Sequence, residues 1–208
     1  YAQLGPIYCD EGGDEFWAAK RGPCQRLGTK VATALKARLK PGGTSLYVGA
    51  GVAEIPPLVM ETLELDRRVV ACNLRRQEVQ VLNRACGTVP IRFQHHDAGS
   101  VKQRVDHLWL VSVLNDPERF PELSVLSYGR ANPVTFNAKQ FVTQQRTVAR
   151  LVDRCLGRLT VPGLVTTTVE EAVWVAEWCH RRGIPYRIEP RTYASPTVGD
   201  PICFMRIG

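Results

Sequence analysis

The feature that most limits the possible folds is the glycine turn Gly49-Ala50-Gly51, which lies between an expected strand and an expected helix. The short run Ser45–Val48 precedes the turn and predicts a buried strand. Residues 53–65 follow and place apolar side chains at helical spacing, with two prolines in the first turn, where a missing N–H costs little. In this context the glycines predict a sharp turn that a ligand can approach closely.

Strand-like and helix-like segments alternate along the rest of the 208 residues. We expect further strands at 68–72, 91–95, 164–169, 186–189 and 202–207, and one within 106–114. Further helices are expected at 14–39, with an interruption at Gly22-Pro23, and at 75–86, 137–159 and 170–182, whereas 115–136 reads as irregular. Such alternation predicts an α/β fold, doubly wound, with a mostly parallel seven-stranded sheet, an antiparallel C-terminal strand pair and helices on both faces.

We expect one globular unit, in which residues 1–40 form a helical segment packing on a Rossmann-like domain of residues 41–208. A ligand site in such a sheet lies beyond the carboxyl ends of the strands. No apolar run reaches the ~18 residues of a membrane-spanning helix, and the start Tyr1–Leu4 does not resemble a signal peptide. Seven cysteines without a Cys-x-x-Cys pair fit reduced, buried thiols, and predict a cytoplasmic protein.

The net charge of +7 can attract nucleic acid or phosphorylated substrates, or it can serve solubility. Arg146, Arg150, Arg154 and Arg158 recur every four residues of the expected long helix, and form a stripe that is either solvated or in contact with phosphates. The pair His95-His96 does not predict a metal site, because adjacent strand residues point to opposite faces.

The residue Glu54 helps to choose the ligand of the glycine turn. A dinucleotide site has a third glycine at this position, where a carboxylate would repel the pyrophosphate. S-adenosylmethionine (SAM) carries no phosphate and has a cationic sulfonium and ammonium, so Glu54 favours SAM. Glu54 is otherwise a simple acid at a helix start.

The segment Lys40-Pro41-Gly42-Gly43, followed by Leu46–Gly51, resembles the start of class I SAM-dependent methyltransferases. The order of elements is similar over about residues 30–208. The resemblance implies a SAM-binding domain in which the glycine turn holds the methionine part of SAM, the end of the second strand binds the ribose, and a residue after the third strand contacts adenine. Carried over by position, the cofactor-binding residues are Gly49, Ala50, Gly51, Glu54, Asn73, Leu74, Asp97, Ala98 and Ser112.

Three departures from the family pattern concern catalysis and affinity. Tyr47 and Asn73 stand where the family has acids, and Asn115-Asp116-Pro117-Glu118 only partly matches the Asp/Asn-Pro-Pro-aromatic motif of amino-group methyltransferases. Asn115 and Asp116 are the catalytic candidates, since they could orient a nucleophile or take a proton. Asp116-Pro117 can equally form a turn, and Asp97 can equally cap the turn before Gly99.

The sequence favours a SAM-dependent methyltransferase whose acceptor, a small molecule or a nucleic acid, is not identified. The main alternative is an NADP-dependent oxidoreductase, in which Arg75-Arg76 after the second strand would receive the 2′-phosphate. A third reading is a catalytically silent domain of the same fold that binds nucleic acid. The oligomeric state is left open.

Overall fold

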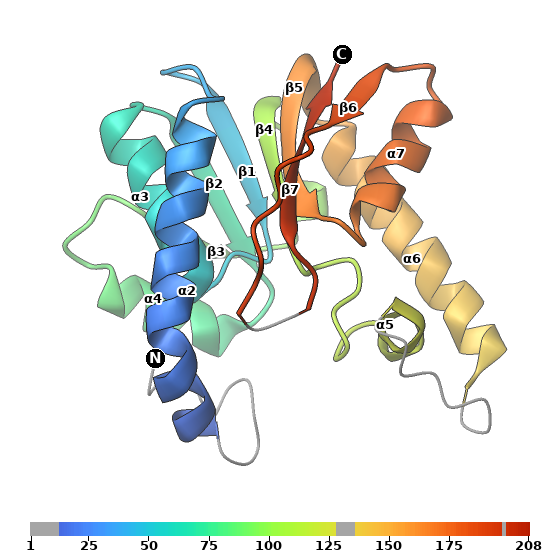
Figure 1. Cartoon of the computed structure of the whole chain (residues 1–208), viewed down its shortest axis with the longest axis horizontal. Coiled ribbons are helices and arrows are strands. Elements are labelled where there is room, and N and C mark those ends of the chain that lie inside the picture. The colour runs from blue at the N-terminus through green and yellow to red at the C-terminus, as the bar shows by residue number, and fades with distance from the viewer. Residues whose placement is uncertain (1–12, 128–135, 197–198) are drawn as a thin grey trace.

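A seven-stranded sheet runs through the centre of the molecule, as the computed structural model of residues 13–127, 136–196 and 199–208 shows (Figure 1). Its spatial order is β3-β2-β1-β4-β5-β7-β6. Strands β1 to β5 are parallel neighbours, and β7 runs antiparallel to both β5 and β6. The expected mostly parallel sheet with a C-terminal antiparallel pair is confirmed. The bounds are β1 Thr44–Val48, β2 Arg68–Asn73, β3 Phe93–His95, β4 Val105–Leu110, β5 Leu159–Thr168, β6 Tyr186–Ile188 and β7 Ile202–Ile207.

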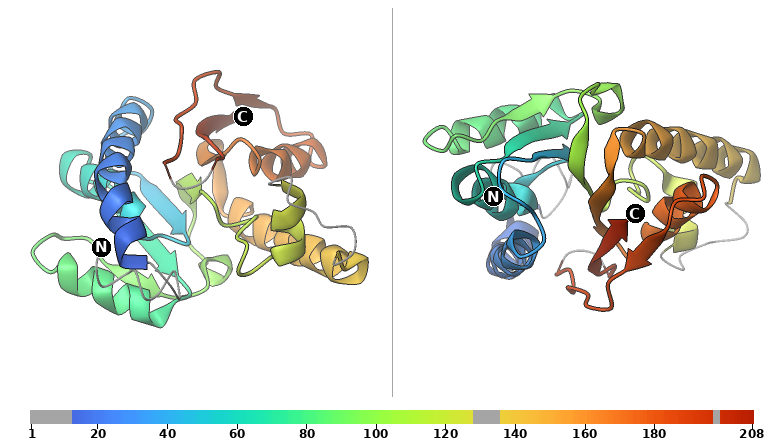
Figure 2. Two further views of the ribbon diagram at one scale, coloured as in Figure 1. Left: turned by 60° about the horizontal axis from the view of Figure 1, so that its bottom comes forward. Right: turned by 90° about the horizontal axis from the view of Figure 1, so that it is seen from above.

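Helices cover both faces of the sheet, in two groups that the views of Figure 2 separate clearly. On one face lie α2 (Gly13–Lys36), α3 (Ile55–Glu64) and α4 (Arg76–Ala85), and on the other lie α5 (Pro121–Ser127), α6 (Ala138–Leu156) and α7 (Ala172–His180). Two short 3-10 helices, Val52–Glu54 and Ala98–Ser100, follow the ends of β1 and β3.

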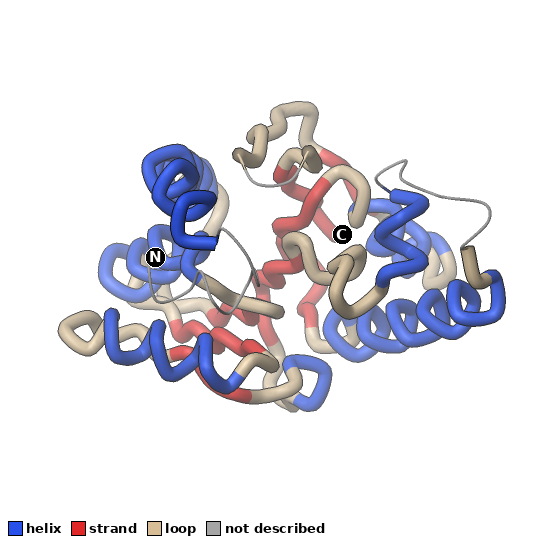
Figure 3. The backbone as a smooth tube through the Cα atoms, turned by 90° about the horizontal axis from the view of Figure 1, so that it is seen from below, coloured by secondary structure: helices blue, strands red, loops and turns tan. Residues whose placement is uncertain are grey.

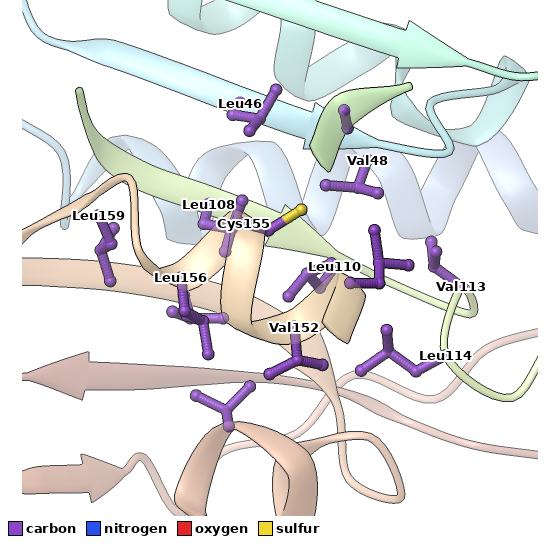
Figure 4. Close-up of a cluster of buried hydrophobic side chains, with 14 of the residues drawn as sticks. Leu46, Val48, Leu108, Leu110, Val113, Leu114, Val152, Cys155, Leu156 and Leu159 are labelled. Carbon is purple, nitrogen blue, oxygen red and sulfur yellow. The ribbon is translucent and has the colours of Figure 1, made fainter. Parts of the chain in front are cut away.

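The core consists of two apolar layers because successive strand residues point to opposite faces. In β1, Leu46 and Val48 belong to the layer that also contains Val152 and Cys155 of α6 (Figure 4). Tyr47, between them, points to the other layer, which α2, α3 and α4 cover. β1 is therefore buried on both faces, as expected for a central parallel strand.

A polar network is buried under α3, within this second layer. Glu61 of α3 accepts hydrogen bonds from the hydroxyls of Ser45 and Tyr47 and pairs with Arg67 at 2.9 Å. His107 of β4 lies 3.2 Å from the same carboxylate. All five side chains are fully or almost fully buried. Their hydrogen bonds hold α3 to β1 and β4.

Several expected boundaries were wrong. Helix α2 continues through Gly22-Pro23 without an interruption, because the buried residues Val31 and Leu35 pack its later turns onto α3. The segment 115–136 contains α5, whose packing against α6 the local sequence did not reveal. The strand within 106–114 ends at Leu110, and α6 ends at Leu156 because β5 begins at Leu159 rather than at 164.

Among the described residues six cysteines are buried and free, as expected of reduced thiols, and Cys9 lies outside the described residues. In the same part of the chain, no helix is both long and apolar enough to cross a membrane.

Candidate functional site

A cavity of about 740 Å³ opens at the carboxyl ends of β1, β2 and β4. Figure 3 looks toward this edge of the sheet, with the two groups of helices on either side of the strands. The walls come from α2, the glycine turn, the end of β2, the loop after β4 and residues 195–196. The cavity lies where a doubly wound sheet is expected to bind its ligand.

The glycine turn forms the floor of the cavity and is tightly packed. Gly49 has φ +69°, and a Cβ added there would lie 2.9 Å from Cγ2 of Val113. Gly49 and Gly51 line the cavity, whereas Ala50 is buried and is not among the lining residues. The Ala50 amide donates to the carbonyl of Cys72 (2.9 Å), so β2 holds the turn in place.

Two buried carboxylates face the cavity. Glu54, 8% exposed, accepts a hydrogen bond from the Gly51 amide at 2.8 Å. Burial raises its pKa to about 7, since the Gly51 bond offsets only part of the desolvation and Glu78 adds negative charge. Glu78, 2% exposed, comes from the first turn of α4. The cavity is therefore built to take a ligand with cationic or hydroxyl groups rather than a polyanion.

Asn73, at the end of β2, ties neighbouring backbone segments together. Its Nδ2 donates to the Ala50 carbonyl at 2.8 Å, and its Oδ1 accepts from the Arg75 amide at 2.7 Å. Asn73 lines the cavity together with Leu74, whose side chain is half-exposed. The second lone pair of Oδ1 can still accept a bond from a ligand.

The end of β3 contributes Asp97 and Ala98 to the cavity wall. Asp97 caps the following 3-10 helix, as its Oδ1 accepts from the Gly99 amide at 2.9 Å, and its other oxygen lies 3.4 Å from Nη1 of Arg154. His96 also lines the cavity and contacts the Ser100 hydroxyl. The prediction that Asp97 caps the turn before Gly99 is thus confirmed, and Asp97 also lines the cavity.

The loop after β4 is held by a carboxylate that follows the carboxyl end of the neighbouring strand β5. Glu171, 1% exposed, accepts the amides of Ser112 (2.9 Å), Val113 (2.6 Å) and Leu114 (2.6 Å). Ser112, with φ +54°, lies on the cavity wall. Glu171 therefore fixes the backbone of this loop at the cavity wall.

The two candidate catalytic residues occupy different places. Asp116 lines the cavity and accepts from the Glu118 amide at 3.0 Å, which makes the Asp116-Pro117 segment a turn. Asn115 is buried, is not a lining residue, and has its Nδ2 3.4 Å from Glu170. Within the described residues its Oδ1 has no hydrogen-bond partner. Asp116 is the one of the pair that reaches the cavity.

Several lining residues have no recognisable sequence signal. Glu78 stands in an ordinary helix start, and Trp109 lies within an apolar strand. From α2 come Cys24, Leu27, Gly28 and Val31. The distant Glu171 holds the loop after β4, and only the three-dimensional arrangement reveals its partners.

Arg75, the candidate for a 2′-phosphate, is occupied by acids. It forms an ion pair with Glu118 and lies 4.0 Å from Glu78, so carboxylates surround it at the cavity wall. Arg76 is exposed and is not a lining residue. In the part of the chain that the structure covers, no group of three or more His, Cys, Asp or Glu side chains is arranged to hold a metal ion.

No protein-family model matches the chain, and a search of curated proteins finds no sequence match. Solved structures do match. Magnesium protoporphyrin IX methyltransferase of Synechocystis PCC 6803, with bound SAM, is 11% identical at a TM-score of 0.56, over 91% of this chain and 80% of that one. The N-methyltransferase NodS of Bradyrhizobium japonicum WM9 is 12% identical at 0.53, over 90% and 97%.

A tRNA m1G37 methyltransferase of M. jannaschii is 8% identical at a TM-score of 0.51. The match includes 86% of this chain but only 49% of that protein. These proteins differ in their named substrates, yet each superposes on most of this chain at a TM-score above 0.5. The chain is a divergent representative of the class I SAM-dependent methyltransferase fold.

Proposed function

We propose that the protein is a SAM-dependent methyltransferase that binds SAM in the cavity at the glycine turn. The observation that carries the proposal is Glu54, a buried carboxylate that lines the cavity beside the glycine turn and whose partners are hydrogen-bond donors rather than cations. A buried acid of this kind gains from a cationic partner, and the ammonium of SAM is such a partner. Structures with this fold include one with bound SAM, which supports the same ligand.

The remaining residues suit the other parts of SAM. Gly49 and Gly51 offer backbone that the methionine part can approach closely, and Ala50 supports the turn from behind. Asn73 and the buried Glu78 lie where ribose hydroxyls need acceptors, so Glu78 supplies the charge that Asn73 lacks. Asp97, Ala98 and Leu74, which line the cavity, would enclose the adenine, and Ser112, which also lines it, would lie near the transferred methyl.

The oxidoreductase alternative fits the cavity less well. A pyrophosphate or a 2′-phosphate would lie near Glu54, Glu78 and Glu118, each of which repels it. Arg75, the side chain that would receive the phosphate, is already paired. SAM brings no phosphate into this acidic part of the site.

When bound, SAM supplies an activated methyl group, which an acceptor takes by in-line displacement. The protein contributes the alignment of the two reactants, which supplies much of the rate in such reactions. Glu171 holds the backbone of Ser112 and Val113 rigid beside the acceptor path. Asp116 is positioned to orient the acceptor or to take its proton.

Isothermal titration with SAM and S-adenosylhomocysteine tests the proposal. We expect Glu54→Gln to weaken SAM binding by roughly tenfold to a hundredfold, since a charge-assisted contact contributes about 1.5–3 kcal/mol. Glu64→Gln on the exposed side of α3 is the matched control and is expected to bind SAM as the wild type does. Binding of NADP⁺ with no heat from SAM would overturn the proposal.

A further inference from the structure

A second hollow, of about 510 Å³, continues the cavity along α2. One wall is formed by Pro23, Arg26, Leu27 and Lys30 of α2, and the other by residues 191–196 before β7. Leu27, Ser195 and Pro196 line both hollows, so the second opens beside the first. We call this second hollow the α2 groove.

Among the described residues that line it, the α2 groove has three cationic side chains and no acidic one. Arg26 and Lys30 lie one helical turn apart on α2, and Arg191 comes from the opposite wall. Like charges at this helical spacing repel each other. Within the described residues no ion pair offsets any of the three. The groove therefore holds a local excess of positive charge, next to a cavity rich in carboxylates.

Both walls of the groove are fixed by the fold. The amide and carbonyl of Tyr193 pair with Ile202 of β7 at 2.9 Å each, and its buried ring packs edge-on against Phe204. The Arg191 guanidinium lies 5.3 Å from the Tyr193 ring centre. Lys20 of α2 donates to the Pro196 carbonyl at 2.7 Å, which joins the two walls. The cations are thus held on a scaffold rather than on a free end.

We propose that the α2 groove binds a phosphate group of the methyl acceptor. A phosphate carries enough charge to meet several cations at once, and arginines bind its oxygens in pairs. The acidic cavity would take the cationic cofactor, and the basic groove beside it would take the anionic end of the acceptor. The assignment to the acceptor rests on the proposed function, whereas phosphate binding by the groove does not.

The phosphate can belong to a nucleic-acid strand or to a small phosphorylated molecule, and two probes separate these sources. The first is a fluorescein-labelled single-stranded RNA of ten nucleotides, measured by anisotropy across salt concentrations. The second is ribose 5-phosphate, measured by calorimetry with ribose as its unphosphorylated control.

The test variant is Lys30→Gln/Arg191→Gln, and Arg92→Gln/Lys102→Gln is its control with the same change in net charge. Arg92 and Lys102 are exposed and precede β3 and β4. They therefore lie toward the amino ends of these strands, whereas the cavity opens at the carboxyl ends. We expect the test variant to lose roughly tenfold or more in affinity for whichever phosphate probe the wild type binds. With RNA, the salt dependence should also fall, by about 0.7 per lost phosphate contact.

Binding of RNA alone would assign the phosphate to a nucleic acid, and binding of ribose 5-phosphate but not ribose would assign it to a small molecule. Either result supports the groove if only the test variant loses it. Equal losses in both double variants, or no binding of either probe by the wild type, would overturn the inference. Titration with SAM is done in parallel, because its failure in the wild type would refute the proposed function without touching the groove.

Discussion

Gly49 shows how a single residue sets the shape of the cavity floor. Its φ of +69° disfavours any side chain, and an added Cβ would lie 2.9 Å from Val113. Gly42 has a similar φ of +74° but no atom within 4 Å of an added Cβ. The two glycines therefore separate backbone strain from steric clash.

We expect Gly42→Ala to lose about 1 kcal/mol in free energy of unfolding, which is the usual strain of a left-handed residue. Gly49→Ala should lose about 1–2 kcal/mol more than Gly42→Ala in free energy of unfolding, because the Val113 side chain must also move. Urea denaturation measures both, and calorimetry should show weaker SAM binding only for Gly49→Ala. Equal losses in the two variants would mean that contact with Val113 adds no steric cost to a Cβ at position 49.

Glu54 gives the protein a pH dependence that can be read without ligand. Burial raises its pKa from 4.5 to about 7, so the folded protein holds a proton there that the unfolded chain releases between these values. The stability contributed by Glu54 is therefore fully present below pH 4.5 and falls as the pH rises to about 7. We expect Glu54→Gln to flatten this decline in urea denaturation between pH 5 and pH 8, and to be the more stable protein at pH 8.

The exposed Glu64 provides the comparison, since its replacement by Gln should leave the decline as it is in the wild type. If Glu54→Gln and Glu64→Gln follow the same curve, Glu54 ionises as an ordinary surface acid and its burial has no electrostatic consequence.

Among single residues, those that belong to a local motif were predictable from the sequence. Gly49, Gly51 and Glu54 follow directly on a buried strand, and the structure places all three on the cavity wall. Glu78 and Glu171 carry no local signal, because their roles depend on which segments the sheet brings together. Asn115 was expected at the cavity but is buried and is not among the residues that line it, whereas its neighbour Asp116 is.

The loop after β4 is the element of the cavity wall whose backbone depends most on a single side chain from another element. Three successive amides, from Ser112 to Leu114, donate to the single carboxylate of Glu171. An unsatisfied buried amide costs about 1–3 kcal/mol. The loop therefore needs the hydrogen-bond acceptor that the Glu171 carboxylate provides.

We expect Glu171→Ala to lose about 3 kcal/mol in free energy of unfolding and to weaken SAM binding. Glu170→Ala, at the neighbouring position, removes only a 3.4 Å contact with Asn115 and should lose under about 1 kcal/mol. Denaturation and calorimetry on both variants check this. Similar losses at the two positions would contradict the role given to Glu171.

The order of elements was predictable because each one carries its own periodicity. β1 and β4 are short apolar runs, and α6 places Val148, Leu151 and Cys155 on one face. Boundaries were less predictable where packing overrides local preference. Pro23 does not end α2, and the turn before β5 stops α6 so that Arg158, expected on the arginine stripe, falls outside the helix.

At the scale of the whole molecule, stability against acid depends on the polar network under α3. Burial alone would raise the pKa of Glu61, but His107, Ser45 and Tyr47 outweigh it and lower the pKa to about 2. A lowered carboxyl pKa contributes stability above 4.5 that is lost as the pH falls toward 2. The buried Glu54 and Glu171, with pKa values near 7, act in the opposite sense between 4.5 and 7. These three acids together predict greatest stability at about pH 4, just below the ordinary carboxyl pKa, because two raised acids outweigh one lowered acid above it.

Replacing Glu61 should remove the acid-sensitive side of this profile. Glu61→Gln removes one of the two carboxylates that pair with Arg67, whereas Asp106 stays 2.6 Å away, so the loss should approach but not exceed the about 3–5 kcal/mol of a broken buried pair. We expect a loss of this size in urea denaturation at pH 7, shrinking as the pH falls from 4.5 toward 2, where the wild type also protonates Glu61. Glu64→Gln on the same helix should follow the wild type at every pH. A loss for Glu61→Gln that stays constant from pH 7 to pH 2 would show that the network stabilises the protein by packing alone, without the charge on Glu61.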